Sequence, residues 1–126
     1  MISPKTILVV EDHSDVREAV VELLQSEGHR TVTASNGREA LAYLLANAVP
    51  SLIILDLEMP EVGGWEVLAV LRCYPRFSSV PVLLFSGAPV SEPARAVYTV
   101  LPKSVAADVL AKMVGDLLAV ERSTFG

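Results

Sequence analysis

The chain has 126 residues, of which 52% are hydrophobic and 20% are charged, and its formal net charge is −5. This size and composition predict one folded domain, and the acidic balance argues against a nucleic-acid surface, which needs clustered Lys and Arg. The sequence has no apolar run long enough to span a bilayer and no signal peptide at its start. A single cysteine, Cys73, excludes an internal disulfide, so we expect a cytoplasmic protein without membrane insertion.

Strand-like and helix-like segments alternate along the chain. The strand-like runs are expected at residues 6–10, 30–34, 52–55, 80–85 and 97–101. Apolar residues recur with helical spacing at 16–24, 40–45, 65–71 and 109–118, and a short or irregular helix is expected at Ser91–Val97. Five β-α units in series predict a parallel sheet with helices on both faces.

Several residues are expected to mark the ends of these helices. Ser14 or Asp15 is the expected N-cap of the first helix, and Gly28 is expected to end it. Asn36 is expected to turn the chain into the second helix, and Ser104 to cap the last one.

The order of the strands follows from their polarity. The runs that begin at residues 6, 51 and 80 are continuously apolar and suit the centre of a sheet, whereas 30–34 and 97–101 suit its edges. This predicts an α/β protein with a doubly wound five-stranded parallel sheet, flavodoxin-like (βα)5, in the order 2-1-3-4-5. In such a sheet, ligands bind between the carboxyl ends of the first and third strands.

Acidic residues stand at both of these strand ends. Glu11 and Asp12 follow the first strand, and Asp56 ends the third. Carboxylates that meet at one edge bind hard divalent cations, so a Mg²⁺ site is expected there. No G-x-G-x-x-G motif follows the first strand, which argues against dinucleotide binding.

Two further polar residues are expected at the same edge. Ser86 ends the fourth strand, and Lys103 follows the fifth. Together these groups favour phosphoryl transfer, with Asp56 as the nucleophile that forms an aspartyl-phosphate. Lys103 would supply a positive charge for the incoming phosphoryl oxygens, and Ser86 a hydroxyl donor.

The motifs, in this order, resemble those of the response regulator receiver domain, the phospho-acceptor module of two-component signalling. The resemblance covers about residues 5–121 and implies one receiver domain over residues 1–126 with no output domain. The matching residues are Val9-Val10-Glu11-Asp12, Ala34-Ser35-Asn36-Gly37-Arg38-Glu39-Ala40-Leu41, Asp56-Leu57-Glu58-Met59-Pro60, Gly64, Ser86-Gly87 and Lys103.

The resemblance also implies a function and its partners. A histidine kinase or phosphotransfer protein would donate a phosphoryl group to Asp56 in a Mg²⁺-dependent reaction, and the module would catalyse only its own phosphorylation and dephosphorylation. The backbone carbonyl of Glu58 is implied as a further metal ligand, and its side chain, with Ala88, as tuning the rate. Phosphorylation would switch the binding of a downstream protein or a second copy of the chain.

The chain departs from the family pattern near the fourth helix. Ser86 and Lys103 are 17 positions apart, several fewer than is usual in the family, which is why the helix is expected to be short. Val100 stands where the family has an aromatic switch residue, and Tyr98 is expected on the same face of the strand, farther from the site. The acceptor chemistry is therefore expected to be intact, whereas the usual output relay is in question.

Two other functions agree with parts of this pattern. A pseudo-receiver, a protein-binding module that does not signal by phosphorylation, is favoured by Val100 and the shortened fourth helix and disfavoured by the complete set of acids with Lys103. A Mg²⁺-dependent phosphohydrolase with an aspartate nucleophile would need a further acidic pair after Lys103, but the acids there are spaced along a helix.

Three other residues have ordinary structural interpretations. His13 is expected to be a partly exposed residue beside a helix start rather than a metal ligand, although it could sit over the site. Trp65 is expected to pack with part of its ring exposed, and Cys73 to be buried at a helix end.

Overall fold

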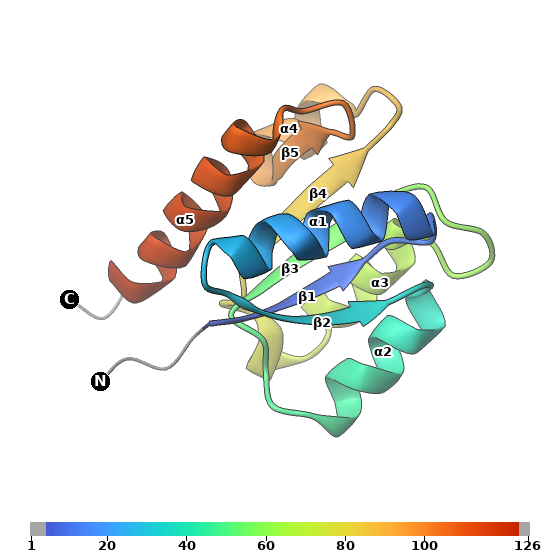
Figure 1. Ribbon diagram of the computed structural model, residues 1–126. Helices are drawn as coiled ribbons and strands as arrows, with labels where there is room; N and C mark the ends of the chain where they lie inside the picture. The colour runs from blue at the N-terminus through green and yellow to red at the C-terminus, as the bar shows by residue number, and fades with distance from the viewer. Residues whose placement is uncertain (1–4, 124–126) are drawn as a thin grey trace.

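Five parallel strands form one sheet in the computed structural model, which describes residues 5–123 (Figure 1). The strands are β1 (Thr6–Val10), β2 (Arg30–Ala34), β3 (Leu52–Asp56), β4 (Val82–Ser86) and β5 (Thr99–Pro102). They lie in the order β2-β1-β3-β4-β5, and every pair is parallel. The predicted fold class and strand order are therefore confirmed.

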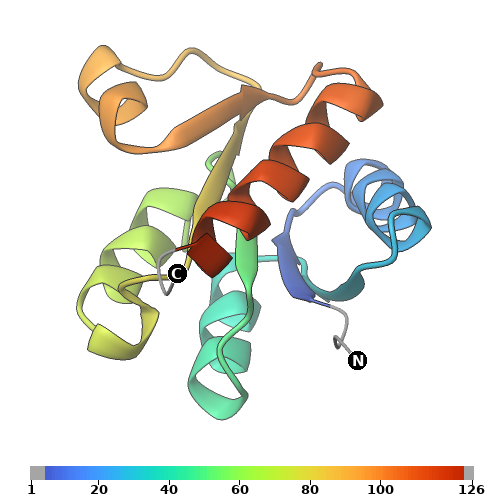
Figure 2. The same ribbon diagram turned by 90° about the vertical axis from the view of Figure 1, so that its left-hand side faces the viewer.

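Helices cover both faces of this sheet. They are α1 (Ser14–Ser26), α2 (Gly37–Ala46), α3 (Gly64–Arg72), the 3₁₀ turn η1 (Pro75–Phe77), α4 (Glu92–Val97) and α5 (Ala107–Ser123). The helices α1 and α5 pack on one face, and α2 and α3 on the other (Figure 2). Among the described residues, no helix has the length and apolar character needed to cross a membrane.

The two faces of the central strands feed two separate apolar clusters. In β1, Leu8 and Val10 pack toward α2 and α3, whereas Ile7 and Val9 pack toward α1 and α5. Because both faces are covered, β1, β3 and β4 are apolar at almost every position. The edge strands β2 and β5 are only partly buried, which explains their polar residues.

Two of the predicted helix caps are wrong. The first helix begins at Ser14, so its N-cap is His13, whose side chain makes no capping hydrogen bond. The last helix begins at Ala107, because a turn in which the Val105 amide donates to the Pro102 carbonyl (3.0 Å) lies between it and β5. Ser104 is part of that turn and caps nothing.

The other two expected helix boundaries are confirmed. Asn36 is the N-cap of α2, and its side-chain oxygen accepts a hydrogen bond from the Glu39 amide at 2.8 Å. Gly28 follows α1 with a φ of 87°, a left-handed conformation that glycine adopts at little cost.

The third helix and the residues after it depart from one expectation. Trp65 is 46% exposed, as expected, while Val67, Leu68 and Leu71 form the buried face of α3. Cys73 was expected to be buried but is exposed, because α3 ends at Arg72 and Cys73 is its C-cap.

The fourth helix is short, as predicted. It has six residues, and none of them is buried. Tyr98 is the C-cap of α4 rather than part of β5, and it packs with Val100 of β5 against the cluster on the α2–α3 face.

Candidate functional site

The register of the sheet brings the polar residues to one edge. Val10 of β1 is paired with Leu55 of β3, so the next residues, Glu11 and Asp56, emerge at the same level. The backbone continues to be held beyond the strand ends: the Glu11 amide donates to the Ala34 carbonyl (3.0 Å) and the Lys103 amide to the Ser86 carbonyl (2.9 Å). The main chain therefore fixes where each functional side chain begins.

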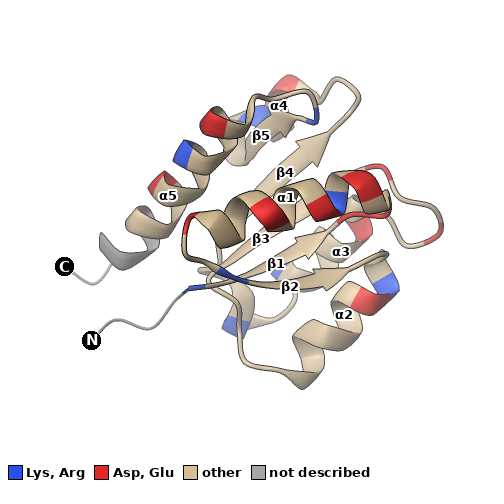
Figure 3. Cartoon of the chain, viewed as in Figure 1, with Lys and Arg blue, Asp and Glu red and all other residues tan. Residues whose placement is uncertain are grey.

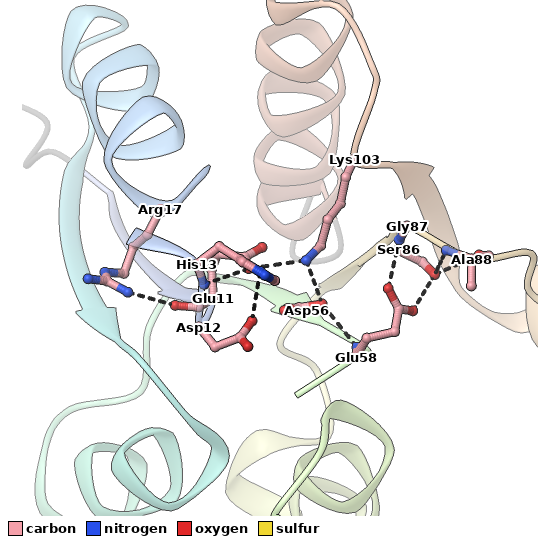
Figure 4. A network of polar contacts seen from close by, with 10 residues as sticks. All are labelled: Glu11, Asp12, His13, Arg17, Asp56, Glu58, Ser86, Gly87, Ala88 and Lys103. Atoms are coloured by element: carbon pink, nitrogen blue, oxygen red, sulfur yellow. Dashed lines mark hydrogen bonds and ion pairs between the residues drawn. The ribbon is translucent and has the colours of Figure 1, made fainter. Parts of the chain in front are cut away.

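The carboxylates of Glu11, Asp12 and Asp56 form one cluster (Figure 4). One ligand atom from each, together with a ring nitrogen of His13, lies within 4.8 Å of the others. Glu11 and Asp56 are buried, and Asp12 is partly exposed. Acidic residues also gather on the loops at this end of the sheet (Figure 3). The predicted convergence of the three acids is thus observed, while their role as metal ligands stays a prediction.

The donor set fits a hard divalent cation. Three buried oxygens, Glu11 Oε1, Asp12 Oδ1 and Asp56 Oδ2, have no hydrogen-bond partner among the described residues. Leaving several buried carboxylate oxygens without partners is costly unless a cation or water satisfies them. A cluster of oxygen ligands with few protein groups is the environment that Mg²⁺ prefers.

Lys103 lies between two of these acids. Its Nζ is 3.1 Å from Glu11 Oε2 and 3.1 Å from Asp56 Oδ1, and its side chain is largely buried. Burial alone would lower the pKa of Lys103, but its hydrogen bonds to Asp56 and Glu11 raise it above the usual value. The lysine is therefore a fixed positive charge beside one oxygen of Asp56.

The environment shifts the pKa values of Asp56 and Asp12 in opposite directions. Burial, aided by the neighbouring Asp12 and Glu11 carboxylates and opposed by Lys103, raises the pKa of Asp56 to about 7. Burial also acts upward on Asp12, but the close Asp56 and Glu11 carboxyl groups and the nearby His13 lower its pKa. Without a cation, Asp56 therefore holds a proton more readily than Asp12 does.

Ser86 stands at the same edge, but its hydroxyl is engaged by Glu58. Ser86 Oγ lies 2.6 Å from Glu58 Oε2 and 2.7 Å from the Ala88 carbonyl, and the Gly87 amide donates to Glu58 Oε1 at 2.7 Å. The Glu58 amide donates to Asp56 Oδ1 at 3.0 Å. The Glu58 side chain therefore points toward the end of β4 rather than into the acidic cluster (Figure 4).

His13 lies closer to the acids than the sequence indicated. Its Nδ1 is 3.2 Å from Asp12 Oδ1 and 3.3 Å from Glu11 Oε2, while 66% of its side chain is exposed. The contact to Asp12 is an ion-pair distance without hydrogen-bond geometry, so Asp12 Oδ1 stays without a hydrogen-bond partner. The exposure agrees with the expected position beside the helix start.

Sequence reasoning missed Arg17. Its Nη1 donates to the Glu11 carbonyl at 3.0 Å, which holds the loop that carries Glu11 and Asp12 against α1. The available signal was a basic residue one turn into the helix that follows the acids. This signal is weak, because basic residues are common on exposed helix faces.

A comparison with protein families identifies one match. A sequence model described as the response regulator receiver domain matches residues 7–117. The response regulator Rre1 of Synechocystis is 39% identical over 87 residues, which are 68% of this chain and 37% of that protein. The polar-differentiation response regulator DivK of Brucella anthropi is 34% identical over 80 residues, which are 64% of this chain and 64% of that protein. The chain thus spans less than two thirds of the length of either relative.

A solved structure shows the same fold over nearly the whole chain. The chemotaxis protein CheY4 of Vibrio cholerae superimposes with a TM-score of 0.82 at 28% sequence identity. The match covers 91% of this chain and 99% of that protein. The likeness therefore extends beyond the sequence motifs to the arrangement of the sheet and helices.

Proposed function

The chain belongs to the response regulator receiver domain family, and from this premise we propose that it is a phospho-acceptor module whose acceptor is Asp56. The observation that carries the proposal is the cluster of Glu11, Asp12 and Asp56 at the carboxyl ends of β1 and β3, with Lys103 in contact with Asp56. The family consists of signalling modules rather than enzymes that turn over an external substrate. The names of the two relatives, both response regulators, support this proposal.

The proposed reaction moves one phosphoryl group onto a carboxylate oxygen. A new bond forms between phosphorus and an oxygen of ionised Asp56, while the phosphorus–nitrogen bond of a phosphohistidine breaks. The departing imidazole nitrogen keeps the electron pair and takes a proton from solvent. We assign the accepting role to Oδ1, because Lys103 lies 3.1 Å from it and can attract the incoming phosphoryl oxygens.

The same acids would also bind the metal ion. Glu11, Asp12 and the Oδ2 atom of Asp56 would hold Mg²⁺, with the Glu58 carbonyl as a further ligand. When bound, the cation supplies positive charge that favours the ionised form of Asp56 and offsets the charge of the phosphoryl group. Ser86 would donate its hydroxyl hydrogen to a phosphoryl oxygen once its bond to Glu58 is released.

The partners follow from the same chemistry. We propose a histidine kinase or a phosphotransfer protein as the phosphodonor and a downstream protein as the receiver of the signal. A phosphorylation-linked dimer and a cytoplasmic location stay predictions. The output face departs from the family pattern, since α4 has only six residues and Val100 replaces the aromatic residue.

The acceptor role is tested with a small phosphodonor. Incubation with Mg²⁺ and acetyl phosphate should add one hydroxylamine-labile phosphoryl group, seen by intact mass spectrometry. Asp56→Asn should abolish the label, whereas Asp116→Asn, which changes an exposed acid on α5, should leave it unchanged. A wild-type protein that gains no label would favour the pseudo-receiver, and rapid turnover of phosphomonoesters would favour a phosphohydrolase.

A further inference from the structure

The Glu58 side chain binds the two hydrogen-bond donors at the end of β4. Its two carboxylate oxygens lie 2.6 Å from Ser86 Oγ and 2.7 Å from the Gly87 amide nitrogen. Both are charge-assisted hydrogen bonds, which are shorter and stronger than bonds between neutral groups. A side-chain hydroxyl and a backbone N–H that converge on one carboxylate form a small anion-binding site.

This anion-binding site adjoins Asp56. Asp56 is paired with Phe85 in the sheet, and the Leu57 amide donates to the Phe85 carbonyl at 3.1 Å, so Ser86 is the next residue along the neighbouring strand. A phosphoryl group on Asp56 would therefore present its oxygens beside the same donors. Because Glu58 and a phosphoryl group are both negatively charged, they cannot occupy these donors together.

We propose that Glu58 is a built-in competitor of the phosphoryl group, a positioning residue that holds Ser86 and Gly87 until phosphorylation displaces it. This inference rests on the proposed function, because it requires a phosphoryl group on Asp56. In the unphosphorylated protein the carboxylate opposes acceptance of a phosphoryl group. On phosphorylation its release marks the change of state at the end of β4.

Two features of the local structure favour this release. Ser86 Oγ has a second acceptor, the Ala88 carbonyl at 2.7 Å, so the buried hydroxyl keeps a partner when Glu58 leaves. Glu58 itself is exposed, and its carboxylate can return to water. The bond from its backbone amide to Asp56 Oδ1 is independent of the side chain, so the loop stays in place while the side chain moves.

The competition is tested by comparing Glu58→Ala with a matched variant. Glu61 lies in the same loop, is also exposed, and makes no hydrogen bond to Ser86 or Gly87 within the described residues, so Glu61→Ala removes a nearby charge without touching the donors. The readouts are the affinity for beryllofluoride with Mg²⁺, which mimics an aspartyl-phosphate, and the initial rate of labelling by acetyl phosphate. Glu58→Ala should raise both by roughly three- to tenfold, and Glu61→Ala should change them far less.

The Ser86→Ala variant distinguishes competition for the donors from a general effect of removing the negative charge of Glu58. If Glu58 acts through these donors, Glu58→Ala should give a smaller gain in Ser86→Ala protein than in the wild type. An equal gain in both backgrounds, an equal gain from Glu61→Ala, or no gain at all would overturn the inference while leaving Asp56 labelling intact. A wild-type protein that is not labelled at Asp56 would overturn the proposed function and this inference together.

The contact itself has a direct readout in the unphosphorylated protein. The amide resonance of Gly87 in a ¹⁵N NMR spectrum should move on Glu58→Ala, because its hydrogen-bond acceptor is lost, and also on beryllofluoride binding to the wild type. A Gly87 resonance that responds to neither change would contradict the proposed role of Glu58.

Discussion

Lys103 contacts the carboxylates of both buried acids, Glu11 and Asp56, and its two contacts act on different groups. It attracts Asp56, which favours the ionised form of that carboxyl group, and it attracts Glu11, which holds that carboxylate in the cluster. Charges this close, in a partly buried site, interact much more strongly than in water. The lysine therefore competes with any metal for the same negative charge.

Replacing Lys103 should separate metal binding from phosphorylation. In Lys103→Met, the loss of positive charge should strengthen Mg²⁺ binding several-fold, while labelling by acetyl phosphate falls by about tenfold or more. Isothermal titration calorimetry at about pH 8 measures the Mg²⁺ affinity, and mass spectrometry measures the labelling. Lys112→Met is the control, because Lys112 forms only an exposed ion pair with Asp116 on α5. Weaker Mg²⁺ binding in Lys103→Met would contradict this account.

At the scale of single residues, the sequence predicted the positions of the acids, Ser86 and Lys103 because each stands at the end of an apolar strand. It did not predict the contact of Glu58 with Ser86 and Gly87. That contact joins residues 28 and 29 positions apart, and it depends on the direction of one flexible side chain. Local sequence patterns carry no information about a side-chain contact between residues so far apart in the chain.

In the loop after β3, the backbone of Gly64 lies very close to the backbone of Asp56 and Leu57. A Cβ atom on Gly64 would overlap the carbonyl oxygen of Asp56 and lie 2.8 Å from the Leu57 Cα. The first residue of α3 therefore packs directly on the strand end that carries Asp56. The side chain of Glu66 reinforces this entry by accepting a hydrogen bond from the Gly63 amide at 3.1 Å.

This approach predicts a large cost for one added methyl group. Gly64→Ala should destabilise the protein by about 2–3 kcal/mol, because backbone atoms rather than a flexible side chain must move. Gly115→Ala should instead stabilise it by about 0.5–1 kcal/mol, since Gly115 lies inside α5 and a Cβ atom added there would meet open space. Urea unfolding measures both, and equal effects would show that the approach to Asp56 is not restrictive.

At the scale of elements, strand positions were predicted well because buried parallel strands are uniformly apolar. Helix starts were predicted less well. Ser14 and Ser104 are residue types that favour N-caps, yet the loop geometry placed His13 at one cap and began α5 at Ala107. The turns that follow β1 and β5 carry Glu11, Asp12 and Lys103, and these turns rather than capping preference set where the two helices begin.

For the molecule as a whole, the order of strands decides where the site lies. Placing β1 and β3 side by side, with β4 and β5 beyond them, brings residues 11 and 103 into contact although 92 positions separate them. This order was predictable from the polarity of the runs. The charge of the carboxyl groups at this edge was not predictable, because it depends on how deeply each group is buried. Burial also links the protonation of these groups to the stability of the fold.

The pKa of Asp56 determines how that coupling depends on pH. Its ordinary value is 3.8, and burial raises it to about 7 in the folded protein without a cation. Between these pH values the Asp56 carboxyl group is protonated in the folded protein and ionised in the unfolded chain. Its contribution to the unfolding free energy is therefore complete below about pH 4 and is lost as the pH rises through 7. The shifts of Asp12 and Lys103 act outside this window, below 3.8 and above 10.5 respectively.

Metal-free wild-type protein should therefore lose roughly 1–3 kcal/mol of unfolding free energy between about pH 5 and pH 7.5, and Asp56→Asn should lose much less. Because a cation binds the ionised carboxylates, Mg²⁺ should restore wild-type stability at about pH 7.5 but have little effect at about pH 5. Asp12→Ala should lose most of this Mg²⁺-dependent gain. Urea unfolding with and without a chelator measures each difference. Parallel pH curves for the wild type and Asp56→Asn would show that the acceptor carboxylate does not carry the buried proton.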